Sequence, residues 1–546
     1  MTSAAMISTP QPEASETGVE ILRRGGNAVD AAIAAALVQG VVDPQMCGIA
    51  GFGSLQLYLP AKGFHGFIDF HGRTPAAARP DMWQDLIEGE TRDGFGFLLK
   101  GRVNDAGYQS ITVPGSLKAY FEAQTAHGVM DWADVVQPAI EQAEAGAVIR
   151  PHVHFFWTED DGMGRVVVSE RLAMTPAGRR IYFRPDGSLK GPGERLDNPD
   201  LARTLRLIAR EGADVFYLGE IAERIEADMK ANGGLLSTQD LKDYRTRHVE
   251  PLWGRFRDFL VASNQPPGGG VMLIEMLQIL EHFDLRALGH NSADYLRVVC
   301  EAMKRATSDK DDFVGDPAFF EVPLARLTDP AYARELAGRI EAGEVAHVER
   351  YGAGGRSGGG QPESKNTTQV SVADAAGNLV SMTHSLGMPS GVVTEGLGFM
   401  YNGCMGVFDP RPGRANSIAP GKARFSSICP SLVFRGEEPR LVIGAPGGTQ
   451  IAMGVLQATL NVLEFGMPIL EAICAPRFSA TSDAIDVTNR IPRFVTRALE
   501  ARGYRVERSH LSYGIAAVHG LERHADGSWS GAADPGHDGM ALGVEG

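Results

Sequence analysis

A polar run that ends at two threonines, followed at once by a strand and a hairpin turn, constrains this chain most. The run reads Lys365-Asn366-Thr367-Thr368, and an alternating strand pattern then leads to a turn at 374–378. Threonine is a weak nucleophile unless a base lies beside it. A cut between Asn366 and Thr367 would create that base, because a freed α-amino group has an ordinary pKa of about 8. The pattern therefore suggests a self-processing hydrolase with an N-terminal threonine.

The bulk properties restrict the partners of the chain. It has 546 residues and a formal net charge of −15, which disfavours nucleic acid and anionic membranes because phosphate binding needs clustered Lys and Arg. The first residues lack the basic and apolar parts of a secretory signal. The closest approach to a membrane span, Ala31 to Val42, is too short. We therefore expect a cytoplasmic protein that acts on a small molecule.

The cysteines do not form a recognisable site. They are five in number, scattered, and never in Cys-x-x-Cys spacing: Cys47, Cys300, Cys404, Cys429 and Cys474. This pattern argues against both a disulfide framework and a zinc site. We expect no metal and no cofactor.

The two parts of the chain differ in their predicted elements. Before residue 350 helical periodicity dominates, with runs at 16–24, 29–39, 116–126, 132–145, 199–211, 221–231, 270–282 and 291–305 and a strand at 54–59. After residue 366 strands are predicted at 368–372, 379–384, 432–434, 441–443 and 515–520, with a helix at 451–465. Strands stacked with helices in both parts indicate an α+β layered sandwich.

A glycine-rich stretch at 352–362 separates the two parts. It could cradle a phosphate, but it lacks the Gly-Lys-Ser/Thr ending and a following helix. Gly355-x-Ser357-x-Gly359 also matches a nucleophile elbow, without the strand and helix that this motif needs. Its composition favours a flexible linker, which suits a position just upstream of a cleavage point.

Two further features could serve chemistry at Thr367. Ser385 lies one hairpin away and could orient the threonine hydroxyl, although strand statistics alone favour an ordinary strand hydroxyl. Gly447 and Gly448 lie between a strand and a helix, where backbone N–H groups could stabilise an oxyanion, although Pro-Gly-Gly is also a common turn.

Two pairs of residues could bind an anionic part of a substrate. Ser426 and Ser427 can hold a carboxylate or simply cap a turn, and the sequence leaves these alternatives equal. His71 and Arg73 form a compact basic pair that could dock an anion or belong to the surface.

Together these residues resemble the γ-glutamyltranspeptidase family of N-terminal nucleophile hydrolases. Co-linear motifs carry the resemblance: 21–32, Val113-Pro114-Gly115-Ser116, Pro266-Pro267-Gly268-Gly269-Gly270, Thr367-Thr368, Ser426-Ser427, Pro446-Gly447-Gly448 and 531–535. The resemblance implies a four-layer αββα fold and a precursor that cuts itself into a large segment, 1–366, and a small segment, 367–546. It also implies that Thr367 is both nucleophile and base, that Ser385 supports it, and that Gly447 and Gly448 form the oxyanion loop.

The departures from the family pattern concern the acyl pocket. Family members hold a substrate α-amino group with an acidic residue, where this chain has Val407, and with a polar group, where it has Gly387. The family's carboxylate-binding arginine matches His71, with Arg73 two residues on. The stretch 409–425 is also shorter than the lid-bearing stretch of many relatives. We therefore predict an amide whose acyl group carries a carboxylate and no required amino group, as in oxamate amidohydrolases and glutaryl acylases.

Two alternatives stay open at this point. One is a true γ-glutamyltransferase or glutathione hydrolase, in which another residue replaces the missing acid. The other is an inactive binding protein that retains the fold. For either enzyme the expected assembly is a large and a small subunit from one precursor, with a possible dimer of these heterodimers.

Overall fold

The computed structural model describes residues 2–352 and 367–544, and its centre is a pair of seven-stranded antiparallel sheets. One sheet has the order β1-β22-β21-β17-β16-β11-β10, and the other has the order β23-β2-β12-β13-β3-β4-β9. The strands of the first are β1 (Thr2–Ser3), β10 (Leu252–Phe256), β11 (Phe259–Ser263), β16 (Ser431–Arg435), β17 (Glu438–Gly444), β21 (His519–Arg523) and β22 (Trp529–Ala533). Those of the second are β2 (Met6–Thr9), β3 (Phe52–Leu59), β4 (Phe64–Phe70), β9 (Arg247–Val249), β12 (Thr368–Ala373), β13 (Leu379–Ser385) and β23 (Met540–Gly543).

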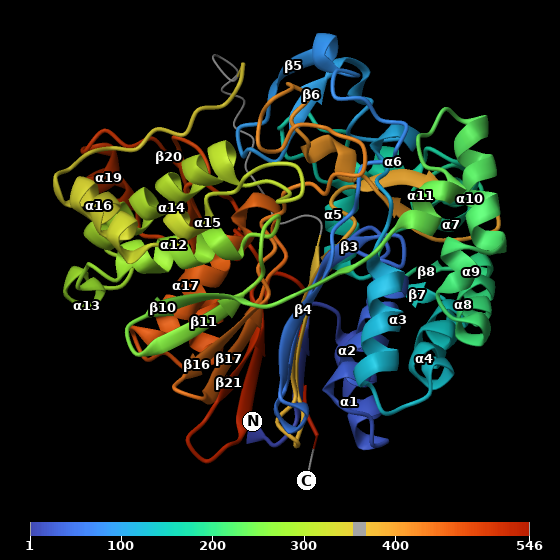
Figure 1. Cartoon of the computed structure of the whole chain (residues 1–546), viewed down its shortest axis with the longest axis horizontal. Helices are drawn as coiled ribbons and strands as arrows, with labels where there is room; N and C mark the ends of the chain where they lie inside the picture. Colours follow the sequence, from blue (N-terminus) through green and yellow to red (C-terminus); the bar gives the residue numbers. More distant parts are fainter. Residues whose placement is uncertain (1, 353–366, 545–546) are drawn as a thin grey trace.

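Helices cover the outer face of each sheet, which gives four layers (Figure 1). On the second sheet lie α1 (Pro12–Arg23), α2 (Ala28–Val42), α3 (Ser116–His127), α4 (Trp132–Ala145) and α8 (Pro199–Glu211). On the first lie α12 (Gly270–Leu280), α14 (Ala293–Phe313), α16 (Pro330–Glu341) and α17 (Ile451–Leu463). The predicted α+β, four-layer αββα fold is confirmed.

Shorter elements connect the layers. The helices are α5 (Pro151–Thr158), α6 (Val168–Leu172), α7 (Pro176–Tyr182), α9 (Asp214–Tyr217), α10 (Glu220–Ala231), α11 (Thr238–Asp243), α13 (Leu285–Leu288), α15 (Leu324–Leu327), α18 (Ile469–Cys474) and α19 (Arg493–Glu500). The strands are β5 (Ile87–Glu90), β6 (Phe97–Leu99), β7 (Ala147–Val148), β8 (Arg195–Leu196), β14 (Pro389–Val393), β15 (Met400–Asn402), β18 (Phe478–Ser479), β19 (Ile485–Val487) and β20 (Val506–Arg508).

Both central sheets contain strands from before and after the segment 353–366, so the two parts of the chain form one body. In the second sheet, β12 lies between β2 and β13, and β13 in turn pairs with β3. In the first sheet, β16 lies between β11 and β17. Except for Gly352, the predicted linker at 352–362 lies outside the described residues.

Helix α2 illustrates how local sequence and packing combine. Asn27 and Asp30 form a reciprocal capping box that starts the helix, and every residue of α2 except Gly40 is buried. A helix that is apolar all round must lie inside the protein, and α2 packs between α1, α4 and the strands β12 and β13. It thus forms a rigid support behind the hairpin that follows Thr367.

One predicted strand is wrong. The segment 515–520 was expected to be extended, but β21 begins only at His519, and Ile515 and Ala516 have φ values of 64° and 54°. The Ala517 backbone N–H donates to the Pro446 carbonyl at 3.0 Å. This contact with the turn that follows β17 keeps residues 515–518 out of the sheet, and no local propensity encodes it.

Candidate active site

Strand pairing brings Thr367 and Ser385 together. Thr367 immediately precedes β12, Ser385 ends β13, and Thr368 pairs with His384 in the ladder. The Thr367 Oγ1 and Ser385 Oγ atoms are 2.9 Å apart, and both residues are buried. The Gly387 backbone N–H also donates to Ser385 Oγ at 2.8 Å. The serine hydroxyl is therefore held in place from two sides.

A buried polar network lies behind this pair, on the α2 side of the hairpin. Gln39 of α2 donates through Nε2 to Thr368 Oγ1 at 2.7 Å, and its Oε1 lies 2.7 Å from His384 Nε2. The Tyr120 hydroxyl lies 2.6 Å from His384 Nδ1. Burial lowers the pKa of His384 to about 3, so the ring is neutral, with Nε2 donating to Gln39 and Nδ1 accepting from Tyr120. The network fixes the register of both strands next to Thr367.

The inter-sheet face of the same hairpin is also polar near Thr367. Thr383 Oγ1 donates to Gln369 Oε1 at 2.6 Å, and Ser381 Oγ donates to the Ile443 carbonyl of the opposite sheet at 3.1 Å. Buried polar groups retained in this way need partners with fixed geometry. The space between the sheets is therefore polar and hydrogen-bonded near Thr367. At the far end it is filled by apolar residues such as Leu379 and Phe434.

The Gly447-Gly448 turn forms another wall of the same pocket. It joins β17 to α17, with φ values of 150° at Gly447 and 56° at Gly448. A Cβ atom at Gly447 would lie 2.7 Å from the Ala516 side chain. Gly448 and Thr449 line the pocket together with Thr367. The turn is thus placed beside the predicted nucleophile, in a conformation that favours glycine.

The serine pair lines the pocket as well. Ser426 and Ser427 face it together with Phe52, Val407 and Arg424. The loop at 266–270 supports the pair, because the Ser426 backbone N–H donates to the Pro267 carbonyl at 2.9 Å and Gly269 packs closely against Ser427. Two hydroxyls therefore lie on the wall of the pocket that contains Thr367.

Arg424 was missed as a site residue by the sequence reasoning. It is 3% exposed, and its guanidinium lies 4.4 Å from the centre of the Phe52 ring. Its position two residues before the serine pair was a usable signal, because a basic residue next to paired hydroxyls can bind a carboxylate.

His71 and Arg73 are not among the residues that line this pocket. His71 is buried, with Nδ1 2.5 Å from Asp69 Oδ1 and its ring centre 5.8 Å from that of Phe52. Burial alone would raise the pKa of Asp69, but His71 and Arg247 lower it below its ordinary value. Arg73 is half-buried, and its backbone bridges Val113 and Ala423. Phe52, which packs against His71, lines the pocket, whereas His71 and Arg73 are not among its lining residues.

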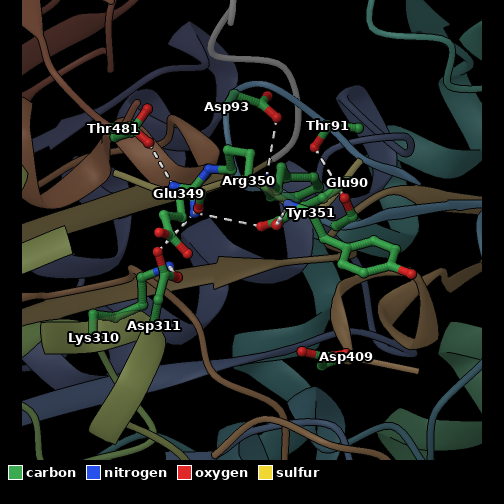
Figure 2. A network of polar contacts seen from close by, with 12 residues as sticks. Glu90, Thr91, Asp93, Lys310, Asp311, Glu349, Arg350, Tyr351, Asp409 and Thr481 are labelled. Atoms are coloured by element: carbon green, nitrogen blue, oxygen red, sulfur yellow. Dashed lines mark hydrogen bonds and ion pairs between the residues drawn. The ribbon is translucent and has the colours of Figure 1, made fainter. Parts of the chain in front are cut away.

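An ion-pair network fixes the chain just before residue 353 (Figure 2). Arg350 lies 2.7 Å from Asp311 and 3.4 Å from Glu90, and it donates to the Thr481 carbonyl at 2.5 Å. The Tyr351 backbone N–H donates to Glu90 Oε2 at 2.9 Å. The Arg350 guanidinium packs on Gly94, which lines the pocket. The described chain upstream of Thr367 therefore ends against the pocket wall. Asn366, on the other side of the predicted cleavage point, lies outside the described residues.

Metal binding and membrane insertion find no support in the described part of the chain. Within residues 2–352 and 367–544, no three His, Cys, Asp or Glu side chains gather as a metal site, and the five cysteines are free. No helix among these residues has the length and apolar character needed to cross a membrane.

Comparisons with known proteins agree with this geometry. The family model for γ-glutamyltranspeptidase matches residues 14–544. The Acylase ACY 1 proenzyme of Pseudomonas sp. (strain SE83) is 37% identical, with 100% of this chain and 94% of the relative covered. The glutathione hydrolase proenzyme of Escherichia coli (strain K12) is 32% identical, with 97% and 90% covered. The crystal structure of cephalosporin acylase from Bacillus halodurans superimposes with a TM-score of 0.86 at 27% identity, covering 100% of this chain and 96% of the other.

These matches confirm the family resemblance and the enzyme class predicted from the sequence. The relatives are named as proenzymes of acylases and hydrolases, and this chain shares their length and fold. The chain therefore belongs to the γ-glutamyltranspeptidase family of N-terminal nucleophile hydrolases.

Proposed function

We propose that this protein cuts itself between Asn366 and Thr367 and then hydrolyses an amide through an acyl-enzyme at Thr367. The observation that carries the proposal is the 2.9 Å contact of Thr367 Oγ1 with Ser385 Oγ at a pocket also lined by Ser426, Ser427 and Gly448. A nucleophile, a supporting hydroxyl and a glycine turn next to one cavity are the parts that acyl transfer requires.

The chemistry follows from these positions. The Thr367 amine freed by cleavage accepts the proton of its own hydroxyl while Oγ1 attacks the amide carbonyl. Backbone N–H groups of Gly447 and Gly448 stabilise the tetrahedral oxyanion. The protonated amine then gives its proton to the leaving nitrogen, which leaves an ester on Thr367. Water attacks this ester, with the same amine as base, and releases the acid and the free threonine.

The acyl group is proposed to carry a carboxylate, as in oxamyl or glutaryl amides. Ser426 and Ser427 offer two hydroxyl donors on the pocket wall, and Val407 contributes an apolar surface instead of an acid. A substrate ammonium would have no carboxylate partner among the described residues that line the pocket, which disfavours γ-glutamyl donors. The acylase name of a 37% identical relative supports hydrolysis of an amide.

The proposed products of cleavage are a large subunit, 1–366, and a small subunit, 367–546. Because each sheet contains strands of both parts, the two fragments are expected to separate on denaturing gels but to elute together from a native sizing column. Thr367→Ala should give one uncut band and no hydrolysis, whereas the matched control Thr125→Ala, on the exposed side of α3, should give two bands. An uncut wild-type chain, or an active Thr367→Ala variant, would contradict the proposal.

The acyl preference needs a separate assay on the cleaved protein. Glutaryl, oxamyl and γ-glutamyl p-nitroanilides differ in the groups that the pocket must hold. We expect kcat/KM for the better of the first two to exceed that for the γ-glutamyl compound at least tenfold. The reverse order would favour a true γ-glutamyltransferase, while no turnover of any amide, with an uncut chain, would favour a binding protein.

A further inference from the structure

Among the described residues that line the pocket next to Thr367, Arg424 alone has a charged side chain. The others are hydroxyl, glycine, aromatic or aliphatic residues such as Thr449, Phe95 and Ile451. A low-dielectric pocket with one cation attracts anions and repels cations. We infer, on the basis of the function proposed above, that Arg424 determines specificity by binding the carboxylate of the acyl group.

The surroundings of Arg424 differ from those of the other deeply buried arginines. Arg171 pairs with Asp105, Arg305 with Glu301 and Arg477 with Asp534. Arg424 forms no ion pair with an Asp or Glu of the described residues. A buried charge without a partner is costly and is normally neutralised. The missing partner is therefore expected to be a bound anion.

The hydrogen-bonding capacity of Arg424 is also largely unused within the described part of the protein. Its Nη1 donates to the Phe425 carbonyl at 3.3 Å, its guanidinium also interacts with the Cys404 side chain, and its buried Nε has no hydrogen-bond partner there. The Phe52 ring covers one face of the guanidinium. The edge of the guanidinium is the part that matches the two oxygens of a carboxylate.

Gly387 brings the guanidinium close to the reacting groups. A Cβ atom at this position would lie 3.3 Å from Arg424 Nη2, and φ is +75°, so glycine leaves room for the arginine. The Gly387 N–H binds Ser385 Oγ, which contacts Thr367 Oγ1. A chain of contacts through Gly387 and Ser385 thus connects Arg424 to Thr367. Ser426 and Ser427 line the same pocket.

The substrate class that fits is a monoamide of a short dicarboxylic acid. Its free carboxylate would accept hydrogen bonds from Arg424 and from the hydroxyls of Ser426 and Ser427, while its amide carbonyl lies at Thr367. A γ-glutamyl amide would place an ammonium group in a pocket that already holds a guanidinium and has no acid in its lining. Arg424 therefore both selects the carboxylate and excludes the amino acid.

The test compares a charged substrate with a neutral one. Arg424→Met keeps most of the side-chain volume without the charge, and Arg424→Lys keeps the charge without the fork. Glutaryl p-nitroanilide and pentanoyl p-nitroanilide have the same chain length and differ in the carboxylate. We expect Arg424→Met to lower kcat/KM for the glutaryl compound at least 100-fold, mainly through KM, and to change that for the pentanoyl compound less than threefold. Arg424→Lys should give an intermediate loss.

Three comparisons make the result decisive. Arg435→Met, an exposed arginine on β16, should leave both substrates unaffected. If Arg424→Met keeps the preference for the glutaryl compound within threefold, or if Arg73→Met causes the loss instead, the inference is wrong. Self-cleavage scored on denaturing gels reports on the proposed function separately, because Arg424 is not expected to act in it.

A binding measurement tests the inference even if a variant is inactive or a substrate is not hydrolysed. Calorimetry of the cleaved wild-type protein should show glutarate binding at least tenfold tighter than pentanoate, and this difference should vanish in Arg424→Met and become smaller in Arg424→Lys. Equal binding of the two acids to the wild type would overturn the inference even if amide hydrolysis is observed. Absence of all hydrolysis with selective glutarate binding would instead contradict the proposed function alone.

Discussion

At the scale of single residues, the site depends on hydroxyl groups that have more than one partner. Ser385 Oγ contacts Thr367 Oγ1 and accepts from the Gly387 N–H. The second contact fixes the position of the serine oxygen beside the threonine hydroxyl. A hydroxyl held in this way can lower the barrier for a nucleophile without itself forming a covalent bond.

Ser385→Ala should therefore slow both self-cleavage and amide hydrolysis by about 10²-fold. It also leaves the buried Gly387 N–H without an acceptor, at a cost of about 1–3 kcal/mol in the free energy of unfolding. Time courses on denaturing gels and kcat values measure the first effect, and urea titration measures the second. Ser371→Ala, which removes another buried hydroxyl of the same hairpin, should destabilise without slowing cleavage. Equal rates for Ser385→Ala and wild type would exclude the supporting role.

At the scale of elements, the turn between β17 and α17 depends on a distant loop for its shape. Gly447 lies against Ala516, and the Ala517 N–H binds the Pro446 carbonyl. These contacts hold the turn in its position beside the pocket, because neither β17 nor α17 alone determines its conformation.

Gly447→Ala should displace the turn, because its new methyl group would lie 2.7 Å from the Ala516 side chain. We expect kcat to fall by about 10²- to 10³-fold with little change in KM, since only the oxyanion is affected. The double variant Gly447→Ala with Ala516→Gly removes the contact with the Ala516 methyl group but leaves the 2.8 Å contact with the Ala516 Cα, so it should recover only a part of kcat. A single variant with kcat within threefold of wild type would contradict the oxyanion assignment, and equal kcat in both variants would contradict the role of Ala516.

At the scale of the whole molecule, stability depends on imidazoles that are buried in the neutral form. Burial lowers the pKa of His384 to about 3, of His519 to about 3 and of His65 to about 4. Between these values and the ordinary 6.5, the unfolded chain binds protons that the folded chain does not. The free energy of unfolding should therefore fall as pH decreases below about 6.5.

His384→Gln tests this dependence at one position, because glutamine can keep a donor and an acceptor without titrating. Lowering pH from 7 to 5 should destabilise the wild type by about 2 kcal/mol more than the variant. Urea midpoints at the two pH values measure this difference. His248→Gln, which replaces an imidazole with a 60% exposed side chain, is the control and should follow the wild type. Parallel pH profiles for His384→Gln and wild type would contradict the prediction.

Much of the fold could be predicted from local patterns. Helices were predicted at 132–145 and 199–211 with the bounds that α4 and α8 have, and the 368–372 and 379–384 strands became β12 and β13 with one added residue each. These segments carry strong periodicity, so local sequence suffices. The 515–518 turn could not be predicted, because its conformation follows from contact with Pro446 and Gly447. The cytoplasmic location and the dimer of heterodimers stay predictions.

The sequence by itself determined the family, the position of the threonine after a polar run, and the hairpin that carries Ser385, because each depends on residues close together in the chain or on motifs in a fixed order. Only the tertiary structure decided which cation lines the pocket. Arg424 lines it beside Gly387, whereas His71 packs against Phe52 and is not among the lining residues. Such a choice depends on side chains from distant strands meeting in space, and on burial that makes an unpaired charge costly. Spacing along the chain places Arg424 close to the serine pair, but it encodes neither of these.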